Sequence, residues 1–307
     1  MRLLLTIGLS LCLLSSIASQ AMAQYQNPEW IEVSPAGESF HVSMPNTPKV
    51  ETEKQGAVSG HRYIALTGVA TYTLWSITNA NYRTDQDTDA YLDATAELLW
   101  EGLLRAAREQ LDEKARPLAR MTYVRELPPE GLAGREYTLT VGEVTGTTEF
   151  FVAHEHIYVL LVMRKPGGDW SREKFFTSFR PSSDSPAPPK IASGGLGPGV
   201  QGVSPDPTDY NRSFTGREVT QKARVLEKAE PTYTESARKF GVEGRVVMRA
   251  VFTKNGEVTN LHVVSKLPHG LTQKAIEAAR AIRFTPAVKD GQPVSMWMEL
   301  QYNFHLY

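Results

Sequence analysis

The chain has 307 residues, of which 33 are lysine or arginine and 34 are aspartate or glutamate, and it contains a single cysteine. This length corresponds to about two domains. The composition is that of a globular protein, which excludes a disordered chain, a collagen and a polytopic membrane protein. The net charge of −1 argues against a general nucleic-acid-binding protein. One cysteine permits neither an intramolecular disulfide nor a cysteine-rich zinc site.

The N-terminus has the pattern of a secretory signal peptide. Arg2 gives a short positive start, residues 3–18 are mostly apolar and uncharged, and Ala21-Met22-Ala23 is the small–x–small pattern that signal peptidase reads. We expect residues 1–23 to be cleaved, which makes the protein periplasmic. Two alternatives remain open. One is lipidation of Cys12, and the other is an uncleaved membrane anchor, although the apolar run is shorter than the ~20 residues of a spanning helix.

A stretch rich in proline and glycine separates two folded parts. Residues 181–207 include seven prolines and five glycines, and such a segment buries too little apolar surface to fold. We predict a linker over residues 181–221 between an N-terminal domain of residues 24–180 and a C-terminal domain of residues 222–307.

The charge divides at the same place. Residues 24–221 carry 19 basic and 26 acidic side chains, a net charge of −7. Residues 222–307 carry 13 and 8, a net charge of +5. Either the basic part is steered towards acidic partners, or the two parts simply have unrelated surfaces.

The N-terminal part has mixed periodicity. Period-two alternation and β-branched residues predict strands, and a three-to-four-residue apolar repeat predicts helices. The predicted strands are residues 39–44, 71–78, 119–126, 134–141, 147–153 and 157–163, and the predicted helices are residues 89–113 and 170–179. Residues 85–89 have the acidic spacing of a calcium loop, but Ala90 and Ala96 break that pattern. We interpret these residues as an acidic helix start.

Antiparallel strands with helices indicate an α+β fold, here an antiparallel-sheet sandwich. The sequence FHVSMP at residues 40–45 and FFTSFR at residues 175–180 resemble the beginning and end of the PsbP-like sandwich modules.

Two histidines are the main candidate for chemistry in this part. On a strand, His154 and His156 would share a face and offer two metal ligands, with Glu149 as a third. In a hairpin turn they would be ordinary exposed residues. The sequence has no hydrolase nucleophile motif, no zinc-protease motif and no phosphate-binding loop. We therefore expect no enzyme, no metal and no cofactor, and the sequence does not indicate what this domain binds.

The C-terminal part has clear turn signals. Gly241 is suited to end a helix in the left-handed conformation, Asn255-Gly256 favours a two-residue hairpin turn, and Asp290-Gly291 favours another turn. In the last strand apolar residues alternate with polar ones, which indicates one buried and one exposed face. The predicted elements are a short helix beginning near Pro231, strands at residues 245–253 and 258–265, a helix at residues 271–283 and a last strand at residues 296–307.

Seven short motifs between residues 229 and 307 resemble the TonB C-terminal domain: PTYTESAR, GVEGRV, KNGEV, LPHGL, AIEAAR, RFTPAVKDGQPV and YNF. The resemblance implies a three-stranded antiparallel sheet with two helices on one face. It also implies that the last strand is an edge, which binds the TonB box of an outer-membrane receptor as an added strand. An edge strand suits this role because its main-chain groups are unpaired. Thr234 stands where many family members have proline.

The last strand and two residues of the first motif are the predicted partner-binding site. Val294 to Phe304 would supply main-chain bonds, and Trp297 and Gln301 would read the partner's side chains. Trp297 packs on the helix side instead if the alternation is reversed. Tyr233 is expected to pack rather than bind, and Arg238 suits either role. The predicted residues are Tyr233, Arg238, Val294, Met296, Trp297, Met298, Glu299, Leu300, Gln301, Tyr302, Asn303 and Phe304.

Two functions remain open. In the first, the protein is a TonB-like periplasmic factor that binds outer-membrane receptors and supports transport. Resemblance to an energy-transducing TonB also implies an N-terminal anchor with a histidine, and residues 1–23 contain none. In the second, it is a soluble periplasmic binding or scaffold protein. Its C-terminal domain then forms a homodimer through the last strand or binds another envelope protein, and no nucleic acid is involved.

Overall fold

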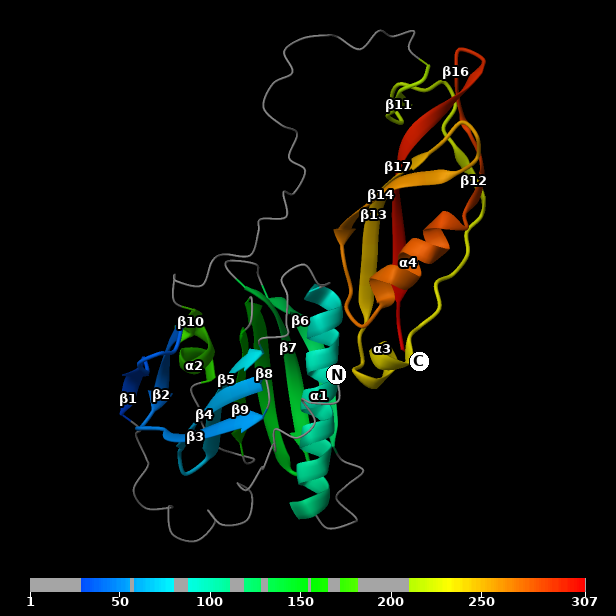
Figure 1. The fold of residues 1–307 in the computed structure, drawn as a ribbon. Coiled ribbons are helices and arrows are strands. Elements are labelled where there is room, and N and C mark those ends of the chain that lie inside the picture. The colour runs from blue at the N-terminus through cyan, green and yellow to red at the C-terminus, as the bar shows by residue number, and fades with distance from the viewer. Residues whose placement is uncertain are drawn as a thin grey trace. The chain divides into compact units, whose positions relative to one another are not determined.

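The computed structural model divides into two units, residues 1–190 and 191–307 (Figure 1). The residues it describes are 29–55, 58–79, 88–110, 119–127, 132–153, 156–164, 172–181 and 210–306. The predicted signal peptide, most of the predicted linker, residues 85–87 and His154 lie outside them. No helix of the described ranges is long and apolar enough to cross a membrane.

The N-terminal unit is built on a seven-stranded sheet in which every neighbouring pair is antiparallel, in the order β3-β4-β5-β9-β8-β7-β6. Its strands are β3 (Lys49–Gln55), β4 (Val58–Leu66), β5 (Ala70–Asn79), β6 (Arg120–Leu127), β7 (Ala133–Val141), β8 (Val144–Ala153) and β9 (His156–Arg164).

The two faces of this sheet are covered by different elements. Phe150 and Phe151 are neighbours on β8 and therefore point to opposite faces. Phe150 stacks on Tyr137 beneath the helix α1 (Thr88–Gln110), whereas Phe151 stacks on Phe179. On that second side lie α2 (Arg172–Ser178) and a small sheet of β1 (Trp30–Val33), β2 (Phe40–Pro45) and β10 (Arg180–Pro181). This unit is an α+β sandwich (Figure 1).

The predicted elements of this unit all occur, with ends shifted by a few residues. Two long strands, β3 and β4, were not predicted. Their sequences, KVETEKQ and VSGHRYIAL, lack a continuous apolar alternation. They form because β4 pairs along its whole length with the strongly apolar β5, and because the Arg62 guanidinium bonds the Glu51 carboxylate across β3 and β4.

The C-terminal unit has three long antiparallel strands, β13 (Gly244–Phe252), β14 (Val258–Ser265) and β17 (Gln292–Phe304), with β17 paired to β13 and β13 to β14. The prediction of three strands was incomplete, because β11 (Ser213–Phe214) and β16 (Ala287–Lys289) also pair with β17. The helices are α3 (Glu235–Lys239) and α4 (Leu271–Arg280). The apolar side of α4 is buried through Leu271, Ala275, Ala278 and Ala279.

The short helix α3 is held at both ends. Thr234 caps its start, since its Oγ1 accepts from the amide of Ala237 and donates to the carbonyl of His269. At its end, Gly241 has a positive φ of 59°, and the amide of Val242 bonds the carbonyl of Ala237. This closure is a Schellman motif. Thr234 therefore supports this turn through the two hydrogen bonds of its side chain.

Three details of the predicted order were wrong. The helix at residues 271–283 ends at Arg280, and β15 (Arg283–Thr285) follows, paired with β12 (Arg224–Glu227). The Asn255-Gly256 turn is a three-residue loop, because the Thr253 amide bonds the Glu257 carbonyl and, of the loop residues, Gly256 alone has a positive φ. The last strand starts at Gln292 and ends at Phe304.

The predicted linker is also too long at its C-terminal end. Residues 210–221 pack on the C-terminal sheet, and we call them the β11 segment. Phe214 is fully buried, with the Arg212 guanidinium 4.0 Å from its ring centroid. Arg212 in turn pairs with Glu218 at 2.7 Å. Sequence composition missed this segment because a single buried aromatic residue anchors it.

Candidate functional site

On the side away from β13, β17 pairs with β11, which runs parallel to Ser295 and Met296. β16 pairs with Gln292 to Val294 at the start of β17. From Trp297 to Phe304, β13 is the one strand paired with β17 in the described part of the chain. We call the other side of Trp297–Phe304 the open edge. The predicted binding stretch of Val294 to Phe304 is therefore too long, because Val294 and Met296 are already paired.

The two outer strands of the sheet differ in regularity. The register between β13 and β17 is uninterrupted from Gly244 opposite Phe304 to Phe252 opposite Met296. The register between β13 and β14 shifts twice, and Asn260 in β14 has a positive φ of 48°. Bulges of this kind protect an edge from further pairing. The β17 edge is therefore the better template for an added strand.

The predicted alternation along β17 is confirmed. Leu300, Tyr302 and Phe304 are buried, whereas Glu299, Gln301 and Asn303 are exposed. Met298 is half-buried on the core side.

Trp297 lies on the exposed face of the sheet, directly opposite Val251 of β13. Its ring centroid is 5.9 Å from that of His262 and 5.7 Å from the Arg249 guanidinium. These neighbours are on β14 and β13, so Trp297 does not pack on the helix side. Val251 is 3% exposed although it points to the same helix-free face as Trp297.

Lys228 reaches the open edge from the segment that leads into α3. Its Nζ donates to the carbonyl oxygen of Gln301 at 2.6 Å and lies 4.3 Å from the ring centroid of Tyr302. Burial, together with the nearby Glu230 carboxylate, raises the pKa of Tyr302 to about 12. Nothing in the sequence marked Lys228, which is an ordinary exposed lysine.

Tyr233 and Arg238 lie together beside the end of β17. The Tyr233 ring packs on Phe304, and its hydroxyl donates to the carbonyl of Val242. The Arg238 guanidinium lies 5.2 Å from the Tyr233 ring centroid and 3.8 Å from Glu235. The structure therefore gives Tyr233 a packing contact and leaves the Arg238 side chain half-exposed.

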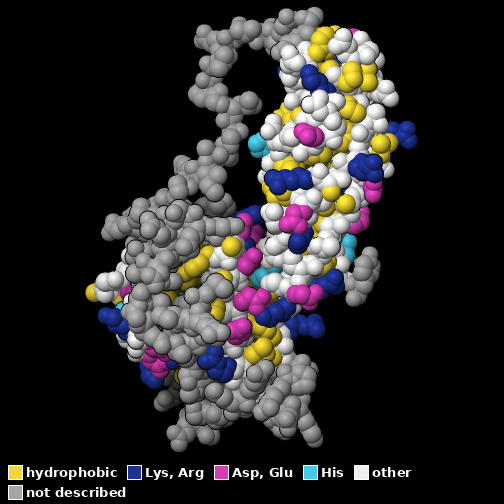
Figure 2. Space-filling model, turned by 45° about the vertical axis from the view of Figure 1, so that its right-hand side comes forward, with side chains coloured by type: hydrophobic (Ala, Val, Ile, Leu, Met, Phe, Trp, Pro, Cys, Tyr) yellow, Lys and Arg dark blue, Asp and Glu magenta, His cyan; other side chains and the backbone are white. Residues whose placement is uncertain are grey.

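The charged side chains of the C-terminal unit are interspersed on the face visible in Figure 2, without a region of one sign.

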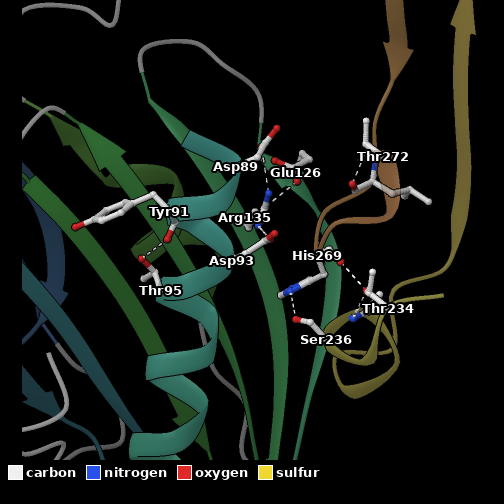
Figure 3. A network of polar contacts seen from close by, with 12 residues as sticks. Asp89, Tyr91, Asp93, Thr95, Glu126, Arg135, Thr234, Ser236, His269 and Thr272 are labelled. Carbon is white, nitrogen blue, oxygen red and sulfur yellow. Dashed lines mark hydrogen bonds and ion pairs between the residues drawn. The ribbon is translucent and has the colours of Figure 1, made fainter. Parts of the chain in front are cut away.

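The N-terminal unit contains two polar clusters that the sequence did not reveal. In the first, three carboxylates converge on the fully buried Arg135 (Figure 3). Asp89 and Glu126 lie 3.1 and 2.8 Å from its guanidinium, and Asp93 bonds it as well. In the second, the Glu38 carboxylate lies 2.5 Å from both His61 Nδ1 and Ser76 Oγ.

The described residues do not place the predicted ligands His156 and Glu149 where they could bind one metal ion together. His156 Nδ1 lies 3.3 Å from Thr78 Oγ1, and its ring stacks on Tyr158. Glu149 is opposite Leu160, four residues along β9 from His156, which corresponds to about 13 Å. Glu149 is therefore too far away to share a metal with His156. The described residues hold no group of three or more histidine, cysteine or acidic side chains arranged for a metal ion.

Known proteins resemble the C-terminal unit. Residues 229–306 match the family described as Gram-negative bacterial TonB protein C-terminal. Protein TonB of Vibrio cholerae serotype O1 is 29% identical over 103 residues, which are 33% of this chain and 42% of that protein. The chain therefore spans less than half of this curated relative. The solution NMR structure of the Pseudomonas aeruginosa TonB CTD is 24% identical and covers 28% of this chain and 87% of that one, with a TM-score of 0.25. By the family match and the motifs that carry it, residues 229–306 are a TonB C-terminal domain.

Proposed function

We propose that the C-terminal domain binds the TonB box of an outer-membrane receptor as a strand added to the open edge of β17. The contrast between the two outer strands carries this proposal. β14 is bulged twice, whereas β17 is regular and open over Trp297–Phe304. Strand addition takes its affinity from main-chain hydrogen bonds and its specificity from alternate side chains.

The geometry also indicates which residues would pair. The carbonyl of Gln301 accepts from Lys228, which is outside the sheet, so Gln301 directs its main-chain groups away from β13. Residues two apart in a strand direct these groups to the same side. Trp297, Glu299 and Asn303 would therefore join Gln301 in bonding the partner. Their side chains line the exposed face of the sheet and would contact the added strand's side chains on that face.

We propose further that the protein acts in the periplasm after cleavage at Ala23, as a TonB-like binding protein that supports transport rather than as an enzyme. The family match at residues 229–306 supports the binding role. Self-association through the same edge is the second candidate, and the regular β17 register supports it equally. The two candidates differ in what occupies the edge.

A proline substitution on the open side tests the proposal. Glu299→Pro removes one outward N–H while leaving the N–H groups that face β13. Val264→Pro is the matched control, because Val264 is 64% exposed and falls at a shift in the register of β14. The probe is a labelled peptide that covers the TonB box of an outer-membrane receptor from the same organism, titrated into the full-length chain.

We expect Glu299→Pro to weaken peptide binding by about tenfold or more, since it both removes a donor and changes the strand geometry. Val264→Pro should bind like the wild type. Circular dichroism confirms that both variants are folded. Equal affinity of Glu299→Pro and the wild type would rule out addition at this edge.

A further inference from the structure

We propose that Lys228 restricts access to the open edge of β17 and favours partner strands that carry a carboxylate. The inference rests on the function proposed above and adds to it the residue that controls the same site.

The Lys228 ammonium already occupies a main-chain group that an added strand needs. Its Nζ donates to the carbonyl of Gln301 at 2.6 Å. An added strand lies about 4.8 Å from its neighbour and would place one of its own N–H groups near this position. The partner must therefore displace Lys228 before it pairs at Gln301.

Displacement begins with movement of the Lys228 side chain. The backbone just before it is held in β12, where Val225 pairs with Phe284 and Glu227 with Arg283. The Glu227 carboxylate also lies 3.5 Å from the Arg283 guanidinium. Lys228 itself is exposed, and its four-carbon chain rotates freely once released.

The position of Lys228 also explains how the edge avoids indiscriminate pairing. Lysines on an exposed strand edge are a common device against edge-to-edge association. Here the Lys228 ammonium is stabilised by a hydrogen bond to the Gln301 carbonyl and by a cation–π contact with the Tyr302 ring, whose centroid is 4.3 Å away. A neutral strand displaces the Lys228 ammonium from both contacts and offers it no new partner. A strand with a carboxylate facing Lys228 offers a new ion pair in exchange.

The decisive variant is Lys228→Met, which keeps the length of the side chain and removes its charge. Lys274→Met is the matched control, because it removes the same charge from α4, where Lys274 pairs with Glu277 at 2.8 Å. The full-length chain is titrated with the TonB-box peptide and with two versions of it, in which the residue facing Tyr302, on the side of the sheet where Lys228 lies, is either glutamate or glutamine.

We expect Lys228→Met to bind the glutamine peptide about three- to tenfold more tightly than the wild type, the effect of one competing hydrogen bond. The wild type should prefer the glutamate peptide by about two- to fivefold, and Lys228→Met should lose this preference. Lys274→Met should behave like the wild type. Weaker or unchanged binding of the glutamine peptide by Lys228→Met overturns the proposal, while wild-type binding still supports strand addition.

A second measurement needs no peptide. In sedimentation experiments, Lys228→Met should form more dimer than the wild type or Lys274→Met, and an added Glu299→Pro substitution should reverse this. If no protein binds the peptide, the receptor function fails, and Lys228 is then judged by sedimentation alone. An unchanged dimer fraction in Lys228→Met would in that case overturn its proposed role.

Discussion

The ring of Tyr233 packs edge-on against the ring of Phe304, with their centroids 5.6 Å apart. Phe304 is the last residue of β17, and the Tyr233 hydroxyl bonds the carbonyl of Val242, just before β13. The tyrosine thus fastens the segment before α3 to the end of β17 and to the residues that lead into β13, at one end of the open edge.

Substitutions of Tyr233 should separate its two contacts. Tyr233→Phe keeps the ring and should cost about 1 kcal/mol through the lost hydrogen bond. Tyr233→Ala also removes the ring and should cost about 3 kcal/mol. Amide hydrogen exchange of β13 and β17 in the full-length chain measures both. Equal protection in the two variants would show that the ring contact contributes nothing.

Arg135 should dominate the stability of the N-terminal unit. Arg135→Met leaves Asp89, Asp93 and Glu126 without their common partner and should cost about 3–5 kcal/mol. Lys49→Met is the control, because it breaks a more exposed ion pair, to Glu51 at 2.8 Å, which should cost about 0–1 kcal/mol. Urea unfolding followed by tryptophan fluorescence compares them. Similar midpoints for the two variants would contradict this ranking.

The C-terminal domain should lose stability in alkali because of Tyr302. Its pKa is raised from the usual 10.0 to about 12 in the folded state. Between these values the unfolded chain releases the proton while the folded chain keeps it, so the unfolding free energy falls as the pH rises. Thermal unfolding from about pH 8 to about pH 12 should show a smaller loss for Tyr302→Phe.

The same variant should not lose stability at neutral pH. The Tyr302 hydroxyl is buried and has no hydrogen-bond partner among the described residues, so its removal leaves no new unpaired group. A melting temperature clearly below that of the wild type at neutral pH would contradict this expectation.

The Glu218 carboxylate should hold the β11 segment in place. Hydrogen bonds from Arg212 and Thr215 lower the pKa of Glu218 from 4.5 to about 2. A lowered pKa means that this contribution is present above about pH 4.5 and is lost as the pH falls towards about 2. Glu218→Gln should speed hydrogen exchange of residues 210–221 at neutral pH. Unchanged exchange there would show that Phe214 alone anchors the segment.

Most strands and helices could be predicted from periodicity, because burial on one face leaves an apolar repeat. β5 and β9 are examples, with Leu74 and Leu160 fully buried and opposite each other. β3 was missed because its pairing depends on β4 rather than on its own apolar residues. The β11 segment was missed because Phe214 lies among residues that favour a linker.

The sequence predicted the strand that forms the candidate site, but not the residues from other parts of the chain that border it. The motifs and the alternation of β17 identified its exposed and buried residues. Local sequence did not show that β11 ends the open edge at Met296, or that Lys228 reaches Gln301, 73 residues away. The contact of Arg135 with Asp93, 42 residues apart, is hidden for the same reason, since only the folded topology brings such residues together.

The unequal outer strands of the C-terminal sheet set a limit on assembly. A sheet with two open edges can add strands without end, whereas a sheet with one open edge can add a single strand. That strand can come from a bound peptide or from a second copy of the chain related by a twofold axis. Pairing through β17 therefore yields a closed complex of defined stoichiometry, never a fibre.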